Sequence, residues 1–172
     1  MKKTERLIYK ALLVAGALVL HLMERNLPVP FMTPGARLGL ANLVTVLALY
    51  TLTKKREVFE IIGVRVLLSS LFGGSMTGFL YGGMGAVFSF LIMVGIKESL
   101  KEKVSIIGVS AAGAVFHHIG QLLVATVILQ NSGVFLYLPI LSVTGILTGV
   151  FIGLTANYTL PYIKRLPYMK RL

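Results

Sequence analysis

Apolar stretches separated by short polar or basic segments dominate the chain from its beginning to its end. Three of these intervals are each interrupted once by turn-forming residues, at 26–35, 72–77 and 130–133. Because clustered proline and glycine do not continue a helix, each interruption divides its interval into two helices. The pattern therefore predicts six helices, at about residues 5–25, 37–53, 57–72, 77–97, 104–130 and 135–160.

Basic residues lie between the apolar intervals, and 14 of the 17 Lys and Arg residues fall into four clusters. The clusters are Lys2/Lys3/Arg6/Lys10, Lys54/Lys55/Arg56, Lys97/Lys101/Lys103 and Lys164/Arg165/Lys170/Arg171. Short loops rich in Lys and Arg stay on the cytoplasmic side of a membrane. If all four clusters are cytoplasmic, each interval crosses the bilayer and returns, and both termini lie inside.

Composition agrees with a membrane protein, since 56% of the 172 residues are hydrophobic and 13% are charged. Soluble domains carry about a quarter charged residues. We therefore expect an all-α integral membrane protein of the cell membrane, with residues 1–172 forming one compact domain of six transmembrane helices. The segment 57–72 is short for a span of roughly 20 residues, so a re-entrant or interfacial segment at 58–72 is the alternative.

Catalytic groups are scarce in this sequence. The chain has no cysteine and no aspartate, and its six glutamates lie at or near predicted helix ends. Neither a paired-carboxylate centre nor a phosphate-binding Walker loop can be assembled from these residues. We therefore predict a protein that is not an enzyme and that uses no cofactor. The basic residues at the ends of apolar spans favour a membrane surface over nucleic acid as their partner.

Polar residues at membrane depth are expensive and need an explanation. Arg65 lies about 12 Å beyond Glu57 at 1.5 Å per residue, near the bilayer middle, as a structural arginine or as a cation for an acidic ligand. His117 and Gln121 share a helix face at i, i+4, whereas His118 points elsewhere, which disfavours a metal site. The predicted substrate-binding residues, which favour an outward-facing pocket, are Arg37, Asn42, Arg65, His117 and Gln121.

Two sequence runs resemble a known family. Pro34-Gly-Ala-Arg-Leu-Gly-Leu-Ala-Asn-Leu-Val-Thr-Val-Leu-Ala-Leu-Tyr50 is similar to the signature of the Gx transporter family, also labelled heptaprenyl diphosphate synthase component I. The run Ser105–Ala125 resembles its second signature, with His118 standing where the family pattern has asparagine. The resemblance covers nearly the whole chain.

The family is similar to the substrate-binding S components of energy-coupling factor (ECF) importers, which are six-helix receptors for vitamins and metal ions. The resemblance implies partners, namely a transmembrane coupling (T) subunit and two ATPase subunits. In S components an Ala-x-x-x-Ala motif on the first helix packs against the coupling subunit, and Ala11 and Ala15 match it. The loop at 26–36 occupies the place of the segment that closes over the substrate.

Three functions remain open from the sequence. The leading hypothesis is an S component that captures a small anionic or phosphorylated molecule, flavin- or isoprenoid-related, from outside. A second is a non-catalytic membrane subunit associated with a polyprenyl (heptaprenyl) diphosphate synthase. A third is a stand-alone carrier, in which His117 and His118 would be the titratable residues at membrane depth.

Overall fold

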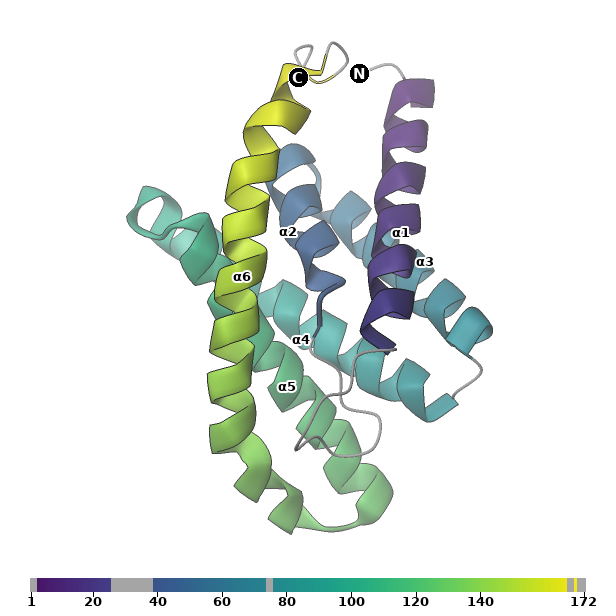
Figure 1. Cartoon of the computed structure of the whole chain (residues 1–172), viewed down its shortest axis with the longest axis vertical. Helices are drawn as coiled ribbons and strands as arrows, with labels where there is room; N and C mark the ends of the chain where they lie inside the picture. The colour runs from purple at the N-terminus through teal and green to yellow at the C-terminus, as the bar shows by residue number, and fades with distance from the viewer. Residues whose placement is uncertain (1–2, 26–38, 74–75, 167–168, 170–172) are drawn as a thin grey trace.

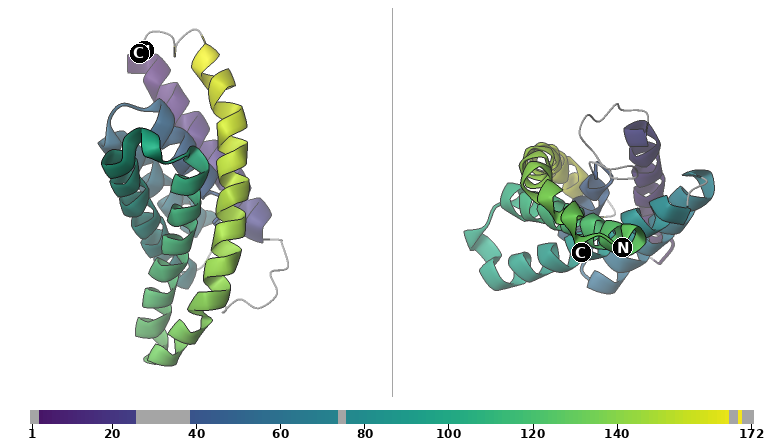
Figure 2. Two further views of the ribbon diagram at one scale, coloured as in Figure 1. Left: turned by 90° about the vertical axis from the view of Figure 1, so that its left-hand side faces the viewer. Right: turned by 90° about the horizontal axis from the view of Figure 1, so that it is seen from below.

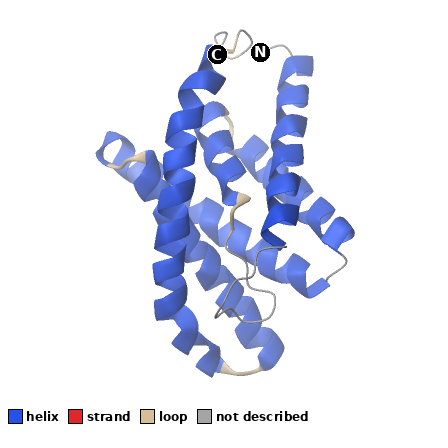
Figure 3. Cartoon of the chain, viewed as in Figure 1, coloured by secondary structure: helices blue, strands red, loops and turns tan. Residues whose placement is uncertain are grey.

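The computed structural model describes residues 3–25, 39–73, 76–166 and 169, and these form helices joined by short turns, without a strand (Figure 3). Figure 1 shows the long helices and the position of both termini at one end of the bundle. The α-helices are α1 (Lys3–Arg25), α2 (Asn42–Thr51), α3 (Lys55–Gly73), α4 (Met76–Leu100), α5 (Ile106–Leu129) and α6 (Leu138–Arg165). Two 3-10 turns, η1 (Lys101–Lys103) and η2 (Ser132–Tyr137), precede α5 and α6.

The predicted six helices are present, but two predicted ends were wrong. The second helix was expected over 37–53 and extends from Asn42 to Thr51 in the structure. Gly39 has a φ of +82°, a left-handed conformation that a right-handed helix does not include. The sixth helix was expected to end at 160, yet it continues through Pro161 to Arg165. A proline inside a transmembrane helix is tolerated when neighbouring groups satisfy the backbone that it disturbs.

Four helices are long and apolar enough to cross a membrane, judged by length and composition over the described residues. These candidate spans are Lys3–Glu24, Met76–Lys103, Ile106–Leu129 and Ser132–Arg165. The ten residues of α2 reach about 15 Å, roughly half the hydrocarbon thickness. Neither α2 nor α3 is among the candidates, so membrane crossing by these two helices stays a prediction.

The outer surfaces of the long helices are apolar, as a lipid environment requires. Large hydrophobic side chains are more than half exposed on several of them, including Leu12 on α1, Leu91 on α4, Val127 on α5 and Phe151 on α6. Water-soluble proteins rarely expose contiguous apolar surface on this scale. We conclude that the protein is a helical membrane protein.

The helices α5 and α6 pack closely along their length and lie side by side in Figures 1 and 2. A Cβ atom added at Gly149 would lie 2.5 Å from Ala111 Cα, and one at Gly153 would lie 2.6 Å from Ile107 Cα. At Gly145 the added atom would lie 2.9 Å from the ring of His118. The glycines spaced four residues apart on α6 therefore let the two backbones approach each other directly.

Substituting Gly149 with leucine is expected to destabilise the protein by about 3 kcal/mol or more, because the new side chain meets backbone that cannot move alone. Thermal unfolding in detergent measures the change. Gly95→Leu is the matched control, since no atom lies within 4 Å of a Cβ at Gly95. Equal destabilisation by both variants would show that helix propensity, not packing against α5, accounts for the loss.

Contacts between charged residues draw three of the basic clusters to one end of the bundle. Arg6 forms an ion pair with Glu57 at 2.9 Å, and Lys10 forms one with Glu60 at 3.0 Å. Lys55 pairs with Glu98, which joins the start of α3 to the end of α4. We call this the basic end of the bundle; both termini lie at the same end (Figure 1).

Candidate functional site

A cluster of buried polar side chains lies away from the basic end of the bundle. Its members come from four helices: the end of α1, the first residue of α2, α3 and α5. Each polar member is less than a tenth exposed, and they are His21, Glu24, Asn42, Arg65, Ser69, His117, His118 and Gln121. Burial of this many polar groups is costly unless they bind each other or a ligand.

Gln121 holds both histidines of α5. Its Nε2 lies 3.1 Å from Nε2 of His117, and its Oε1 lies 3.3 Å from Nδ1 of His118. In this orientation the amide donates to Nε2 of His117 and accepts from Nδ1 of His118. As predicted, the ring of His118 points away from His117, and it packs on Gly145 of α6. The two histidines are nevertheless linked, because both bind the side chain of Gln121.

The position of His117 depends on two glycines. A Cβ at Gly85 of α4 would lie 2.8 Å from Cε1 of His117, and one at Gly120 would lie 2.8 Å from the carbonyl oxygen of Met84. The absence of side chains therefore allows α4 and α5 to cross closely and leaves room for the imidazole. On the other side of the imidazole, a Cβ atom added at Gly39 would lie 3.3 Å from Cδ2 of His117.

Glu24 fixes the entry to α2. Its Oε1 accepts a hydrogen bond of 2.6 Å from the backbone N–H of Gly39, and its Oε2 accepts one of 3.1 Å from Leu40. A carboxylate at the C-terminal end of a helix is disfavoured by the helix dipole. Charge-assisted hydrogen bonds to two backbone groups offset that cost. The side chain of Glu24 thereby joins the end of α1 to the turn that precedes α2.

Arg65 adds a cation to the buried polar cluster. It lies halfway along α3, is 6% exposed, and lines a small cavity together with His21, Glu24, Gly39 and His117. The volume of the cavity is about 20 Å³, which accommodates about one water molecule. Binding of a larger molecule therefore requires the helices around the cavity to separate.

Asn42 adds unused hydrogen-bonding capacity beside this cavity. The side chain is 2% exposed, and neither its Oδ1 nor its Nδ2 has a hydrogen-bond partner among the described residues. A Cβ atom added at Gly39 would lie 3.2 Å from Nδ2 of Asn42 and 3.3 Å from the ring of His117, so the two side chains flank Gly39. A buried amide without partners is costly, and a ligand or water with both a donor and an acceptor would satisfy it.

The structure brings together four of the five predicted site residues. Arg65 and His117 line one cavity, Gln121 binds His117, and Asn42 lies beside them across Gly39. Arg37 lies outside the described residues. Among the described residues no group of three metal-ligating His, Cys, Asp or Glu side chains is present.

Sequence reasoning did not include His21 and Glu24 among the site residues. Both line the cavity, although their position at the end of the first helix also fits the outer membrane interface. The available signal was their i, i+3 spacing, which places them on one face of α1. Only the fold shows that this face turns toward Arg65 and His117.

Ala11 and Ala15 lie apart from the polar cluster. Both are exposed on α1 and line a predominantly apolar groove of about 460 Å³ between α1 and α3. Lys10 and Glu60 lie at its margin and form the ion pair described above. The glycines of α6 pack against α5, whereas these alanines do not pack against another helix of the described bundle.

Substituting Gln121 with leucine is expected to destabilise the protein by about 1–3 kcal/mol, because both histidines would lose a hydrogen-bond partner in a buried site. Reversible unfolding in mixed detergent micelles measures the difference. Ser89→Ala is the matched control, since the buried Ser89 hydroxyl has no partner among the described residues. A Gln121→Leu variant as stable as Ser89→Ala would exclude a structural role for the amide.

Fold and site together define the class: a helical membrane protein with a buried polar cluster at its core. A family model described as heptaprenyl diphosphate synthase component I matches residues 13–159. The chain belongs to this family, which confirms the resemblance to the Gx transporter family that its sequence runs indicated. Neither a curated protein nor a solved structure matches the chain significantly.

Proposed function

We propose that this protein is the substrate-binding S component of an ECF-type importer, with its basic end in the cytoplasm. The observation that carries the proposal is the separation of two features. A buried polar cluster with an unpartnered amide lies away from the basic end, whereas the groove with Ala11 and Ala15 begins beside Lys10. An importer subunit needs these two surfaces, one for the substrate and one for the coupling subunit.

The chemistry of the cluster favours a small anionic substrate with hydrogen-bonding groups. Arg65 supplies a permanent cation and a fork of N–H donors, which suits a carboxylate or phosphate. Asn42 supplies a donor and an acceptor that are not used within the described part of the protein. Glu24 also lines the cavity, and its carboxylate accepts two backbone hydrogen bonds.

The size of the cavity adds a conformational requirement to the proposal. Space for about one water molecule does not accommodate a vitamin-sized substrate. In this proposal the structure is a closed form. Separation of α1 from the beginning of α2 breaks the contacts of Glu24 and gives access to Arg65. Substrate binding would then compete with the hydrogen bonds from Gly39 and Leu40 to Glu24.

The experiment that tests this function is reconstitution with an energy-coupling module. The chain, co-expressed with a coupling subunit and two ATPases, should co-purify with them and should accumulate substrate in proteoliposomes only when ATP is hydrolysed. Mass spectrometry of small molecules that co-purify from native membrane would identify the substrate to use. Failure to associate with any module of a host that expresses all of them would contradict the proposal.

The family description favours a second candidate, a membrane subunit associated with a polyprenyl diphosphate synthase. In that role the chain would form a stable complex with the soluble catalytic subunit and alter the length of its product. Affinity purification with the synthase followed by product analysis separates the two candidates. ATP-dependent uptake without a synthase complex favours the importer, and the reverse result favours the membrane subunit.

A further inference from the structure

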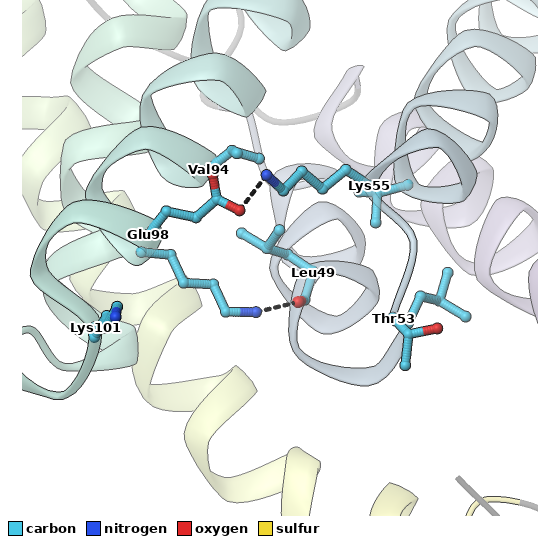
Figure 4. A pocket seen from close by; sticks show the side chains of 9 residues that line it. Leu49, Thr53, Lys55, Val94, Glu98 and Lys101 are labelled. Carbon is cyan, nitrogen blue, oxygen red and sulfur yellow. Dashed lines mark hydrogen bonds and ion pairs between the residues drawn. The ribbon is translucent and has the colours of Figure 1, made fainter.

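A second cleft opens at the basic end of the bundle, remote from the buried polar cluster. It lies among the end of α2, the beginning of α3 and the end of α4, and its volume is about 480 Å³ (Figure 4). The charged residues that line it are Lys55, Lys97, Glu98 and Lys101. Three ammonium groups against one carboxylate leave a net charge of +2 (3 − 1).

Contacts within the cleft hold two of the lysines in place. Lys55 forms an ion pair with Glu98, as the dashed line in Figure 4 shows. Lys97 donates a hydrogen bond of 2.5 Å to the backbone carbonyl of Leu49, and its Nζ lies 4.3 Å from the centre of the Tyr50 ring. Glu98 therefore neutralises Lys55, whereas the uncharged carbonyl of Leu49 positions Lys97 without neutralising it.

Lys101 has no such partner. It is exposed at the rim of the cleft, and no ion pair or hydrogen bond joins its ammonium to another described residue. Its φ is +44°, in the left-handed region that residues other than glycine seldom adopt. The chain thus turns sharply at the end of α4 and leaves an uncompensated cation beside the cleft.

Apart from Thr53, the remaining wall of the cleft is apolar. Its side chains come from the end of α2 and the residue after it, from α3 and from α4, and they are Leu49, Leu52, Val58 and Val94. Cations next to an apolar wall, at the end of a membrane bundle, match an amphiphile with an anionic head. Basic pockets between transmembrane helices are known to receive phosphate-bearing lipid head groups.

We propose that this cleft binds an amphiphile whose phosphate head group carries a net negative charge, with Lys101 and Lys97 contacting the phosphate and the leucine and valine side chains contacting the apolar chain. The phosphate lies between two cations, and one acyl or prenyl segment covers the wall. Such a site is separate from the buried polar cluster, so its occupancy does not depend on the importer proposal.

Native mass spectrometry of the full-length protein in detergent tests the site, with phosphatidylglycerol as the anionic probe and phosphatidylcholine as the neutral one. Lys101→Glu should weaken phosphatidylglycerol binding about tenfold, as expected for loss of one charge-assisted contact. Lys101→Arg should retain it. Lys103→Glu is the matched control, because Lys103 shares the same 3-10 turn and does not line the cleft.

Equal weakening by Lys101→Glu and Lys103→Glu would overturn the proposal, since attraction to the basic end as a whole would then suffice. Phosphatidylcholine binding as tight as that of phosphatidylglycerol would overturn it too. Inorganic diphosphate distinguishes the source of the phosphate. Displacement of the lipid by diphosphate supports a site that also accepts a soluble phosphate compound, and no displacement supports a membrane lipid. Since the assay involves no transport, its failure is distinguishable from failure of the importer proposal.

Discussion

Replacing Ala15 with tryptophan is expected to reduce ATP-dependent uptake by the reconstituted importer more than about tenfold while leaving substrate binding unchanged. Ala15 is exposed in the groove between α1 and α3, so an indole there fills the space that a partner helix would occupy. Small residues at four-residue spacing are effective because they allow close backbone approach, which a large side chain prevents. Uptake in proteoliposomes and equilibrium substrate binding are the two measurements.

Leu12→Trp provides the matched control for this prediction. Leu12 is 62% exposed on α1 and does not line the groove, so its replacement changes the lipid-facing surface alone. Uptake should then remain close to that of the unmodified protein. Loss of substrate binding in the Ala15→Trp variant would assign Ala15 to the fold or the site, and unchanged uptake would remove the groove as a docking surface.

Replacing Arg65 with alanine is expected to weaken binding of an anionic substrate by at least about tenfold, the loss associated with one hydrogen bond to a charged group. Arg65 is the cation that lines the cavity beside Glu24 and His117, and it is 6% exposed. The negative charge of Glu24 would also lose a nearby cation, so a moderate loss of stability accompanies the change.

Arg65→Lys separates these two effects. Lysine keeps the charge but not the planar fork of N–H donors, so stability should recover more than affinity does. Substrate affinity by calorimetry and unfolding in detergent are measured on the same variants. Unchanged affinity in Arg65→Ala with reduced stability would make the arginine structural, which is the alternative that the sequence left open.

The packing of the bundle was partly readable from the sequence. Glycines spaced four residues apart, as on α6, are typical of close helix contact, and Gly149 lies against the α5 backbone. Ala11 and Ala15 have the same spacing, yet they lie exposed on α1. Spacing shows which residues share a helix face, but whether that face meets a neighbour depends on the arrangement of the helices.

The site was predictable for residues whose polarity conflicts with an apolar helix. Arg65, His117 and Gln121 stand out in apolar surroundings because burial of such groups requires partners. Glu24 did not stand out, since a glutamate near the end of a membrane helix can equally lie at the interface. Its role depends on Gly39, whose left-handed backbone turns the chain so that two N–H groups meet the carboxylate.

The sequence by itself determined the class of protein, because hydropathy and charge follow directly from the side chains: a helical membrane protein whose basic clusters mark one end. It also determined the family, through residues 13–159. Tertiary structure alone decided that α2 has only ten residues, that Glu24 joins Arg65 at one cavity, and that Lys101 borders a separate cleft. These outcomes depend on contacts between helices distant in the chain, which no local pattern encodes.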